Sequence, residues 1–339
     1  MKLCFVHPPL DGPVSGGNRY NAALIGAARH LGLALRACAW HPDTAPPEPA
    51  ADETLLWDSL FLPELARRNL AGGQRQGLLL HYLPFHDPLL DENERRRWRD
   101  IVDRALAGMD FHIATGARVA AALRQYRPGR PTWLCEPGVD AAFLSARAQS
   151  PARRQTGPVR LLTVASLLPA KRQRELLDLL HGIDGDWAWH LAGDERPCPD
   201  YARRLWRRAA ELGLTGRIRR HGALTSAALA RLMAGMDLCV QYSAYESYGM
   251  ALAEALAAGL PAIATDVGAA ARLVRHGETG WLTAADDTEG FRAALAGLIG
   301  DRDRLRHYRM AAGRDEPVAA AWRFPALFRQ LALETRGPA

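Results

Sequence analysis

Two glutamates, Glu246 and Glu254, stand eight positions apart in an otherwise small and apolar segment, YESYGMALAEALAAGLPAIATD (245–266). The residues before it, LCVQY (238–242), predict a strand, and the alanine-rich run predicts a helix that begins beside Gly249. The first N–H groups of a helix have no internal partners and carry partial positive charge, so they favour an anion in front of them. Gly249 lets a phosphate approach closely, because it has no side chain.

The two carboxylates suit opposite ends of one ligand, a sugar joined through a diphosphate to a nucleoside. Glu254 falls in an Ala and Leu surface, where a charge needs hydrogen-bond donors, and the hydroxyls of a ribose supply them. Glu246 lies in the loop before the helix, where it can accept hydrogen bonds from a sugar. In the alternative interpretation, Glu254 pairs with an arginine and Glu246 faces water. The order of strand, loop, glycine, helix and second strand favours the ligand.

The elements that must position these residues alternate between strands and helices along most of the chain. This alternation predicts parallel sheets with helices on both faces, and such sheets bind ligands beyond the carboxyl ends of their strands. A polar segment, SARAQSPARRQTGP (145–158), predicts a linker. We therefore expect an α/β protein with two Rossmann-like doubly wound domains that face each other across a cleft. The expected strands cover residues 2–6, 33–40, 77–82, 111–115 and 132–136 before the linker, and 160–165, 187–192, 217–222, 238–242 and 261–265 after it.

Length and composition agree with this organisation. A chain of 339 residues with 48% hydrophobic residues suggests two domains, which we expect at 1–150 and 151–316. Five cysteines lie far apart without CxxC spacing, a pattern typical of reduced thiols. The first residues do not resemble a secretion signal, and no apolar run reaches the roughly 20 residues of a membrane span. We expect a cytoplasmic location, and peripheral contact with the inner membrane face stays open.

The net charge of +6 is compatible with phosphate-bearing ligands of several kinds, including nucleotides, nucleic acids and anionic lipids. The basic residues occur in short pieces such as RRRWR (95–99) and RRLWRR (203–208), which we interpret as solvated helix faces. No segment matches a nucleic-acid-binding module, so we expect no nucleic-acid partner.

Three segments together resemble the retaining glycosyltransferases of family four. ESYGMALAEALAAGLPAIATDVG (246–268) is similar to their E-x7-E signature region, LLTVASLLPAK (161–171) to their strand–loop–lysine segment, and HGETGWL (276–282) to their closing segment. The resemblance implies the GT-B fold of two Rossmann-like domains. It also implies transfer of a hexose-type sugar from a UDP- or GDP-type nucleotide-sugar donor to an acceptor hydroxyl, with retention of configuration and without a metal ion or other cofactor.

The resemblance also implies roles for individual residues. The catalytic residues would be Lys171, which neutralises the donor diphosphate, Glu246, which contacts the sugar hydroxyls, and His81, which lies near the transferred sugar. Glu254 would bind the ribose. The other expected donor-binding residues are Gly16 and Gly17, in an expected glycine-rich loop before a helix from about Asn18, and Ser166, Tyr248, Gly249, Met250 and Ala251.

Some positions depart from the family pattern. Ser166 stands where the family commonly has an arginine that serves as a second phosphate cation, and Arg172 is a candidate to replace it. Ala269 and Arg272 stand where a glycine and a glutamate often follow. Two alternatives stay open: a sugar-nucleotide epimerase of the same fold, and a catalytically silent nucleotide-sugar-binding protein, for which the missing arginine at Ser166 is the reason.

The acceptor is the least determined part of the expected reaction. LLWDSLFLPELARR (55–68) is predicted as an apolar, helix-like run with a basic end, which could contact a membrane or simply cover the sheet. A small molecule, a glycan and a lipid-linked acceptor all stay open. The segment PVAAAWRFPALFRQLALE (317–334) resembles the helix that crosses back to the first domain in GT-B proteins, with Trp322 and Phe324 as its anchors. We expect this crossover helix at about 317–339.

Overall fold

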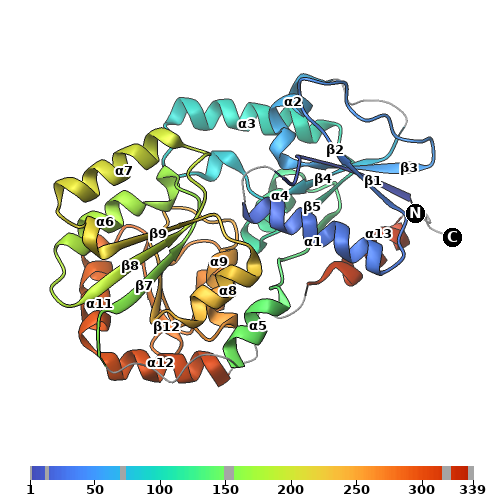
Figure 1. Ribbon diagram of the computed structural model, residues 1–339. Helices are drawn as coiled ribbons and strands as arrows, with labels where there is room; N and C mark the ends of the chain where they lie inside the picture. The colour runs from blue at the N-terminus through green and yellow to red at the C-terminus, as the bar shows by residue number, and fades with distance from the viewer. Residues whose placement is uncertain (1, 12–14, 69–73, 149–155, 315–321, 335–339) are drawn as a thin grey trace. The chain divides into compact units, whose positions relative to one another are not determined.

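The computed structural model describes residues 2–11, 15–68, 74–148, 156–314 and 322–334. The chain divides into two compact units, a first unit of residues 1–137 and 322–339 and a second unit of residues 138–321 (Figure 1). Each unit contains one six-stranded sheet in which every strand pair is parallel. The expected α/β class with two doubly wound sheets is confirmed.

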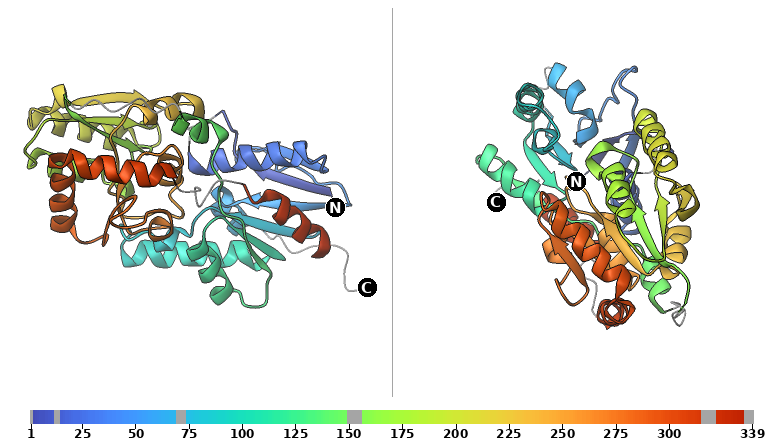
Figure 2. Two further views of the ribbon diagram at one scale, coloured as in Figure 1. Left: turned by 90° about the horizontal axis from the view of Figure 1, so that it is seen from below. Right: turned by 90° about the vertical axis from the view of Figure 1, so that its left-hand side faces the viewer.

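The sheet of the first unit has the strand order β2-β1-β3-β4-β5-β6, and helices cover both of its faces (Figure 2). Successive side chains of a strand point to opposite faces, so a strand covered on both sides is apolar throughout. In β3, Leu55 and Trp57 pack with α2 and α3, whereas Leu56 packs with α1 and α13. The strands are β1 Lys2–His7, β2 Leu35–Ala39, β3 Glu53–Asp58, β4 Gln76–Leu80, β5 Phe111–Ala114 and β6 Thr132–Leu134. The helices are α1 Gly16–His30, α2 Leu62–Arg67, α3 Glu92–Ala107, α4 Ala117–Tyr126 and α13 Phe324–Glu334, with short 3-10 turns η1 Ser59–Phe61 and η2 Pro84–His86.

The sheet of the second unit has the strand order β12-β11-β10-β7-β8-β9. Leu161 of β7 belongs to the core beneath α6, α7 and α11, and its neighbour Leu162 belongs to the core beneath α5, α8 and α9. The strands are β7 Val159–Val164, β8 Trp187–Ala192, β9 Ile218–Gly222, β10 Leu238–Gln241, β11 Ala262–Thr265 and β12 Gly280–Thr283. The helices are α5 Ala141–Ala148, α6 Gln173–His181, α7 Pro199–Glu211, α8 Ser226–Ala234, α9 Met250–Ala257, α10 Ala270–Leu273, α11 Thr288–Gly300 and α12 Arg302–Arg314, with turns η3 Pro169–Lys171 and η4 Thr215–Arg217.

Three local expectations were wrong. The run 55–68 is not one helix, because its first residues complete β3 before the turn η1 and the short helix α2. Gly16 and Gly17 are not in a loop but in the first turn of α1, which Ser15 caps by accepting the N–H of Asn18 at 3.1 Å. The predicted linker at 145–158 begins inside α5.

Other expectations reach residues that the structure does not describe. The boundary at 150/151 and the middle of the predicted linker lie outside the described residues, and this boundary remains a prediction. Residues 317–321 and 335–339 of the expected crossover helix also lie outside them. In the described part, the rings of Trp322 and Phe324 stack, and both pack edge-on against Tyr20 of α1 at 5.7 and 5.2 Å between ring centres. Within the described chain, no helix combines the length and apolar character needed to cross a membrane.

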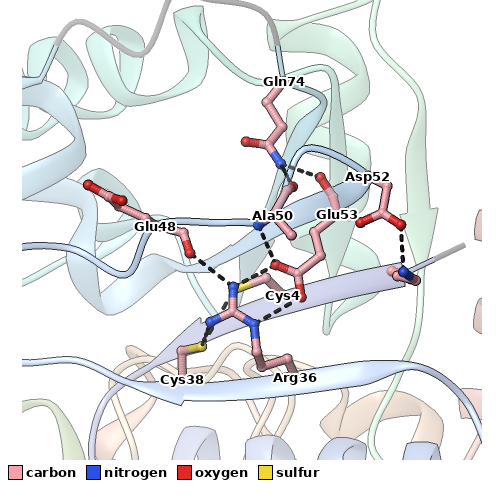
Figure 3. A network of polar contacts seen from close by, with 9 residues as sticks. Cys4, Arg36, Cys38, Glu48, Ala50, Asp52, Glu53 and Gln74 are labelled. Atoms are coloured by element: carbon pink, nitrogen blue, oxygen red, sulfur yellow. Dashed lines mark hydrogen bonds and ion pairs between the residues drawn. The ribbon is translucent and has the colours of Figure 1, made fainter.

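A polar network ties the edge of the first sheet to the segment that leads into β3 (Figure 3). Arg36 of β2 donates to both carboxylate oxygens of Glu53 at 2.9 and 2.5 Å and to the carbonyl oxygen of Glu48 at 3.1 Å. The hydrogen bond from Arg36 lowers the pKa of Glu53 to about 2. Beside this network, the Sγ atoms of Cys4 in β1 and Cys38 in β2 lie 3.5 Å apart as free thiols.

Candidate functional site

His81 follows β4 directly and is held from both neighbouring strands of the first unit. Its backbone N–H donates to Oγ of Ser59, just after β3, at 3.1 Å. The hydroxyl of Thr115, just after β5, donates to its carbonyl oxygen at 3.4 Å. Its side chain retains 10% exposure. His81 therefore lies where parallel sheets place ligand-binding residues, at the carboxyl ends of the strands.

A buried carboxylate and a buried amide contact the His81 ring. Nε2 of His81 lies 3.1 Å from Oδ2 of Asp58 and 3.2 Å from Oδ1 of Asn21. Asn21 donates Nδ2–H to the same Oδ2 at 2.5 Å, and the backbone N–H of Leu60 donates to Oδ1 at 2.7 Å. Burial alone raises the pKa of Asp58, but the His81 imidazole and these hydrogen bonds outweigh it and hold the pKa below its ordinary value. The carboxylate is therefore ionised at neutral pH.

The first turn of α1 packs closely on the same ring. A Cβ atom at Gly17 would lie 3.3 Å from Cδ2 of His81, so this position leaves little room for a larger side chain. Tyr20, one turn further along α1, packs edge-on against the ring at 5.5 Å between ring centres. The structure thus brings Gly17 and His81 together, whereas Gly16 is exposed at the start of the helix.

In the second unit, Lys171 and Glu246 form an ion pair with Nζ and Oε1 2.7 Å apart. Lys171 ends the turn η3 after β7, and Glu246 lies in the loop after β10, the adjacent strand. The backbone N–H of Ala244 donates to the carbonyl oxygen of Ala170 at 2.8 Å, which joins the two loops. Both side chains are partly exposed, 21% for Lys171 and 14% for Glu246. The two expected catalytic residues of this unit are therefore direct neighbours.

Two neutral donors hold the same oxygen of Glu246. Gln241, the last residue of β10, donates Nε2–H to Oε1 at 2.7 Å, and the hydroxyl of Ser243 donates to it at 3.0 Å. Together with Lys171 they place three donors on one carboxylate oxygen. This concentration of donors on Oε1 fixes the orientation of the Glu246 carboxylate.

Gly268, which follows β11, presses against the backbone of the Glu246 loop. It has φ +63°, and a Cβ atom there would lie 2.8 Å from the carbonyl oxygen of Tyr248 and 2.9 Å from Cβ of Glu246. Ala269 N–H donates to that same Tyr248 oxygen at 2.8 Å. The loop therefore depends on a glycine both for backbone conformation and for space.

Helix α9 begins at the end of this loop. Gly249 caps it with φ +102°, a conformation that favours glycine. The N–H groups of Leu252 and Ala253 both donate to the carbonyl oxygen of Gly249, each at 3.1 Å. The N–H groups of Met250 and Ala251 thus precede the first internal hydrogen bonds of the helix, where an anion is favoured.

Glu254 lies in α9 and is 1% exposed. Its negative charge adds to the effect of burial, the larger cause, in raising the pKa of Cys239 in β10 to about 12. The Glu254 side chain is therefore buried more fully than that of Glu246, which is 14% exposed. Its ribose-binding role stays a prediction.

The candidate second phosphate cation has other partners. Arg172 has φ +49°, donates Nη1–H to the carbonyl oxygen of Ala285 at 2.7 Å and lies over the ring of Tyr242 at 5.6 Å. These contacts do not support Arg172 as a replacement for the family arginine. At Ser166, the backbone carbonyl oxygen accepts a hydrogen bond from the side-chain amide of Gln173 at 2.9 Å.

Sequence reasoning missed five residues that support the two sets of side chains. Each acts through a contact with a residue distant in sequence or through its position at a strand end. A polar residue that follows an apolar strand was the signal that could have identified several of them. The missed residues are Asn21, Asp58, Gln241, Ser243 and Gly268.

Comparison with known proteins gives one family match and many partial relatives. Residues 158–301 match the family model described as glycosyl transferases group 1. A phosphatidyl-myo-inositol mannosyltransferase of Mycobacterium leprae is 32% identical over 55% of this chain and 48% of its own length. A D-inositol 3-phosphate glycosyltransferase of Nocardia farcinica is 40% identical over 29% of this chain and 22% of its own length. The chain thus spans about half or less of these curated relatives.

Solved structures resemble the whole chain. A sucrose-phosphate synthase from Thermosynechococcus elongatus has a TM-score of 0.78 at 19% identity, covering 99% of this chain and 98% of its own. HepE from Anabaena, solved in complex with UDP-glucose, has a TM-score of 0.73 at 20% identity, covering 100% of both chains. This likeness confirms the expected GT-B fold class.

Proposed function

We propose that the chain is a glycosyltransferase that moves a hexose-type sugar from a UDP- or GDP-linked donor to an acceptor hydroxyl. The observation that carries the proposal is the Lys171–Glu246 ion pair, with Nζ and Oε1 2.7 Å apart and with Glu246 in the loop that leads into helix α9. It lies inside the segment 158–301, which is similar to group 1 glycosyl transferases. A cation, a carboxylate and a helix N-terminus are the groups that a sugar diphosphate requires.

The geometry supports a division of labour between these groups. Departure of the nucleotide leaves negative charge on the diphosphate, and the Lys171 ammonium with the N–H groups of Met250 and Ala251 would stabilise it. Glu246, released by Lys171 but still held by its two neutral donors, would accept hydrogen bonds from the sugar hydroxyls. Because these groups supply the positive charge, we propose that transfer requires no metal ion.

We further propose that transfer retains the anomeric configuration. In a front-face reaction, the bond from the anomeric carbon to the phosphate oxygen breaks while the bond to the acceptor oxygen forms on the same face. The leaving phosphate oxygen takes the acceptor proton. The support is the likeness of 246–268 to the E-x7-E region of retaining enzymes.

The names of the relatives support an acceptor with free hydroxyls. Two of them are named for inositol compounds, and a third is a lipopolysaccharide core mannosyltransferase of Rhizobium meliloti, 37% identical over 35% of this chain and 34% of its own length. We propose a polyol, glycan or lipid-linked acceptor, with peripheral membrane contact in the lipid-linked case. Most apolar side chains of 55–68 are buried, although Leu60 is 45% exposed, so this run gives little support for membrane contact.

Neither alternative is favoured. The named relatives are transferases and not epimerases. A catalytically silent binding protein also lacks specific support, because the Lys171–Glu246 pair is present although Ser166 replaces the family arginine.

Calorimetric titration with UDP, GDP and their sugar conjugates, without added metal, tests the proposed donor site. We expect one nucleotide to bind with micromolar affinity, and Glu254→Ala to weaken that binding. Absence of binding to every conjugate by the folded protein would contradict the proposal, and an unaltered affinity in the variant would remove Glu254 from the ribose contact.

A further inference from the structure

The hydrogen bonds around His81 determine which of its ring nitrogens carries a hydrogen. The ionised Asp58 carboxylate can only accept, so Asn21 must direct its amide hydrogens toward Oδ2, where Nδ2 lies at 2.5 Å. The amide oxygen of Asn21 then faces Nε2 of His81 at 3.2 Å. Nε2 therefore has two acceptors and no donor, Oδ1 of Asn21 and Oδ2 of Asp58 at 3.1 Å. Only a hydrogen on Nε2 satisfies this arrangement.

We propose that Asp58 and Asn21 are positioning residues that hold His81 with its hydrogen on Nε2 and so keep Nδ1 as the ring atom for the substrate. In the neutral imidazole, Nδ1 then carries a lone pair and accepts a hydrogen bond from a hydroxyl of the bound sugar or acceptor. The inference rests on the proposed function for its ligand class, a polyhydroxylated molecule. The arrangement around Nε2 rests on the structure alone.

Packing alone does not explain why polar side chains are buried beside His81. Asp58 and Asn21 are both 0% exposed, and an isolated buried carboxylate is strongly unfavourable. Apolar side chains could fill the same volume without that penalty. Three elements also fix His81, because Asn21 of α1 and Asp58 of β3 contact Nε2 of the ring and Ser59 of η1 accepts the backbone N–H of His81. A defined ring orientation and a defined tautomer are what these contacts provide.

Asp58→Asn reverses the direction of the hydrogen bonds that join residue 58, Asn21 and His81, and it keeps the shape of the side chain. The N–H of Leu60 donates to Oδ1 at 2.7 Å, so the new amide oxygen must occupy that position. Its NH2 group then replaces Oδ2, which faces both Asn21 and His81. Asn21 must flip to offer its oxygen to this NH2 group, and its own NH2 then donates to Nε2. The variant therefore moves the His81 hydrogen from Nε2 to Nδ1.

Long-range ¹H–¹⁵N spectra of the imidazole rings test this step directly, because they distinguish protonated from unprotonated ring nitrogens. In the full-length wild-type protein near pH 8 we expect His81 to carry its hydrogen on Nε2, and in Asp58→Asn on Nδ1. His81→Gln assigns the signals. A hydrogen on Nδ1 in the wild-type protein overturns the proposal without any variant, even if Asp58→Asn does not fold.

Kinetics then separate positioning from a merely structural role. With UDP-glucose or GDP-mannose as donor and water as the acceptor of the sugar, we expect Asp58→Asn to lower kcat/KM about tenfold, the loss of roughly one hydrogen bond. Nucleotide affinity should be unchanged, since the proposed nucleotide contacts of Lys171, Met250, Ala251 and Glu254 lie in the second unit. Asp110→Asn is the matched control, because Asp110 accepts a backbone N–H from Gln76 at 2.9 Å without contacting His81.

The outcomes distinguish this inference from the proposed function. A tautomer shift with unchanged kcat/KM refutes the positioning role but leaves the transferase intact. If the wild-type protein turns over no donor, the proposed function fails. The inference about His81 is then tested by the ¹⁵N signals of its ring alone. In that case, the inference is also refuted if the ¹⁵N signal of His81 Nδ1 does not shift when the nucleotide sugars are added.

Discussion

Gly268→Ala tests whether the backbone after β11 holds the Glu246 loop. Two costs follow from the structure. A non-glycine residue at φ +63° loses about 1 kcal/mol. The added Cβ would also lie 2.8 Å from the Tyr248 oxygen and 2.9 Å from Cβ of Glu246, an overlap that costs about 1–3 kcal/mol or moves the loop. We expect a total loss of about 2–4 kcal/mol of unfolding free energy.

Gly277→Ala is the matched control, because Gly277 has φ +80° with no atom within 4 Å of an added Cβ. Gly277→Ala should lower the free energy of unfolding by about 1 kcal/mol, the cost of a non-glycine backbone at positive φ. Urea unfolding measures the difference between the two variants, and calorimetry measures nucleotide-sugar affinity in each. We expect only Gly268→Ala to lower the affinity for the nucleotide sugar, because the added Cβ would displace Glu246. Equal stability losses and equal affinities in both variants would refute the steric argument.

Two further predictions concern charges. Lys171→Met should weaken the binding of nucleoside diphosphates about tenfold or more, because a charge-assisted contact is lost. Arg172→Met should change this affinity little, because Arg172 contacts Ala285 and Tyr242 instead. Equal losses of affinity in the two variants, measured by calorimetry, would contradict this assignment. Arg36 lowers the pKa of Glu53 to about 2 from 4.5, so its stabilisation is complete above about pH 4.5 and is lost as the pH falls toward 2. Glu53→Gln should therefore flatten the acid dependence of urea unfolding in this range, and an unchanged dependence would show that the pair contributes nothing.

Local patterns predicted the fold class and part of the candidate site. Strand–helix alternation identified the two sheets, and the segment around Glu246 identified the loop and helix that hold it with Lys171. Two strands were missed for local reasons. β3 runs directly into the apolar turn and helix after it, and β12, Gly280–Thr283, begins with a glycine, a residue type that is depleted in strands. Without these strands, the pattern gave no reason to place Asp58 at a strand end.

The supporting contacts could not be predicted because they join residues far apart in the chain. Asp58 meets Asn21 and His81 across sequence separations of 37 and 23 residues. Such pairs leave no periodic signal, and a single Asp after an apolar run is common. Gly268 is similar, since its role depends on how closely two loops approach. The depth of Glu254, at 1% exposure, also follows from the packing of α9 on the sheet.

The most direct test of the central claim is donor turnover by the wild-type protein and Glu246→Gln, followed by ¹H NMR with UDP-glucose and GDP-mannose. Glu278→Gln is the control, because Glu278 forms an exposed ion pair with Arg275 in the same unit. We expect the wild-type protein and the control to release the nucleoside diphosphate from one donor, with water as the acceptor of the sugar, and Glu246→Gln to do so at least about tenfold more slowly with its fold intact. Equal turnover by all three proteins would contradict the role of the Lys171–Glu246 pair in sugar transfer.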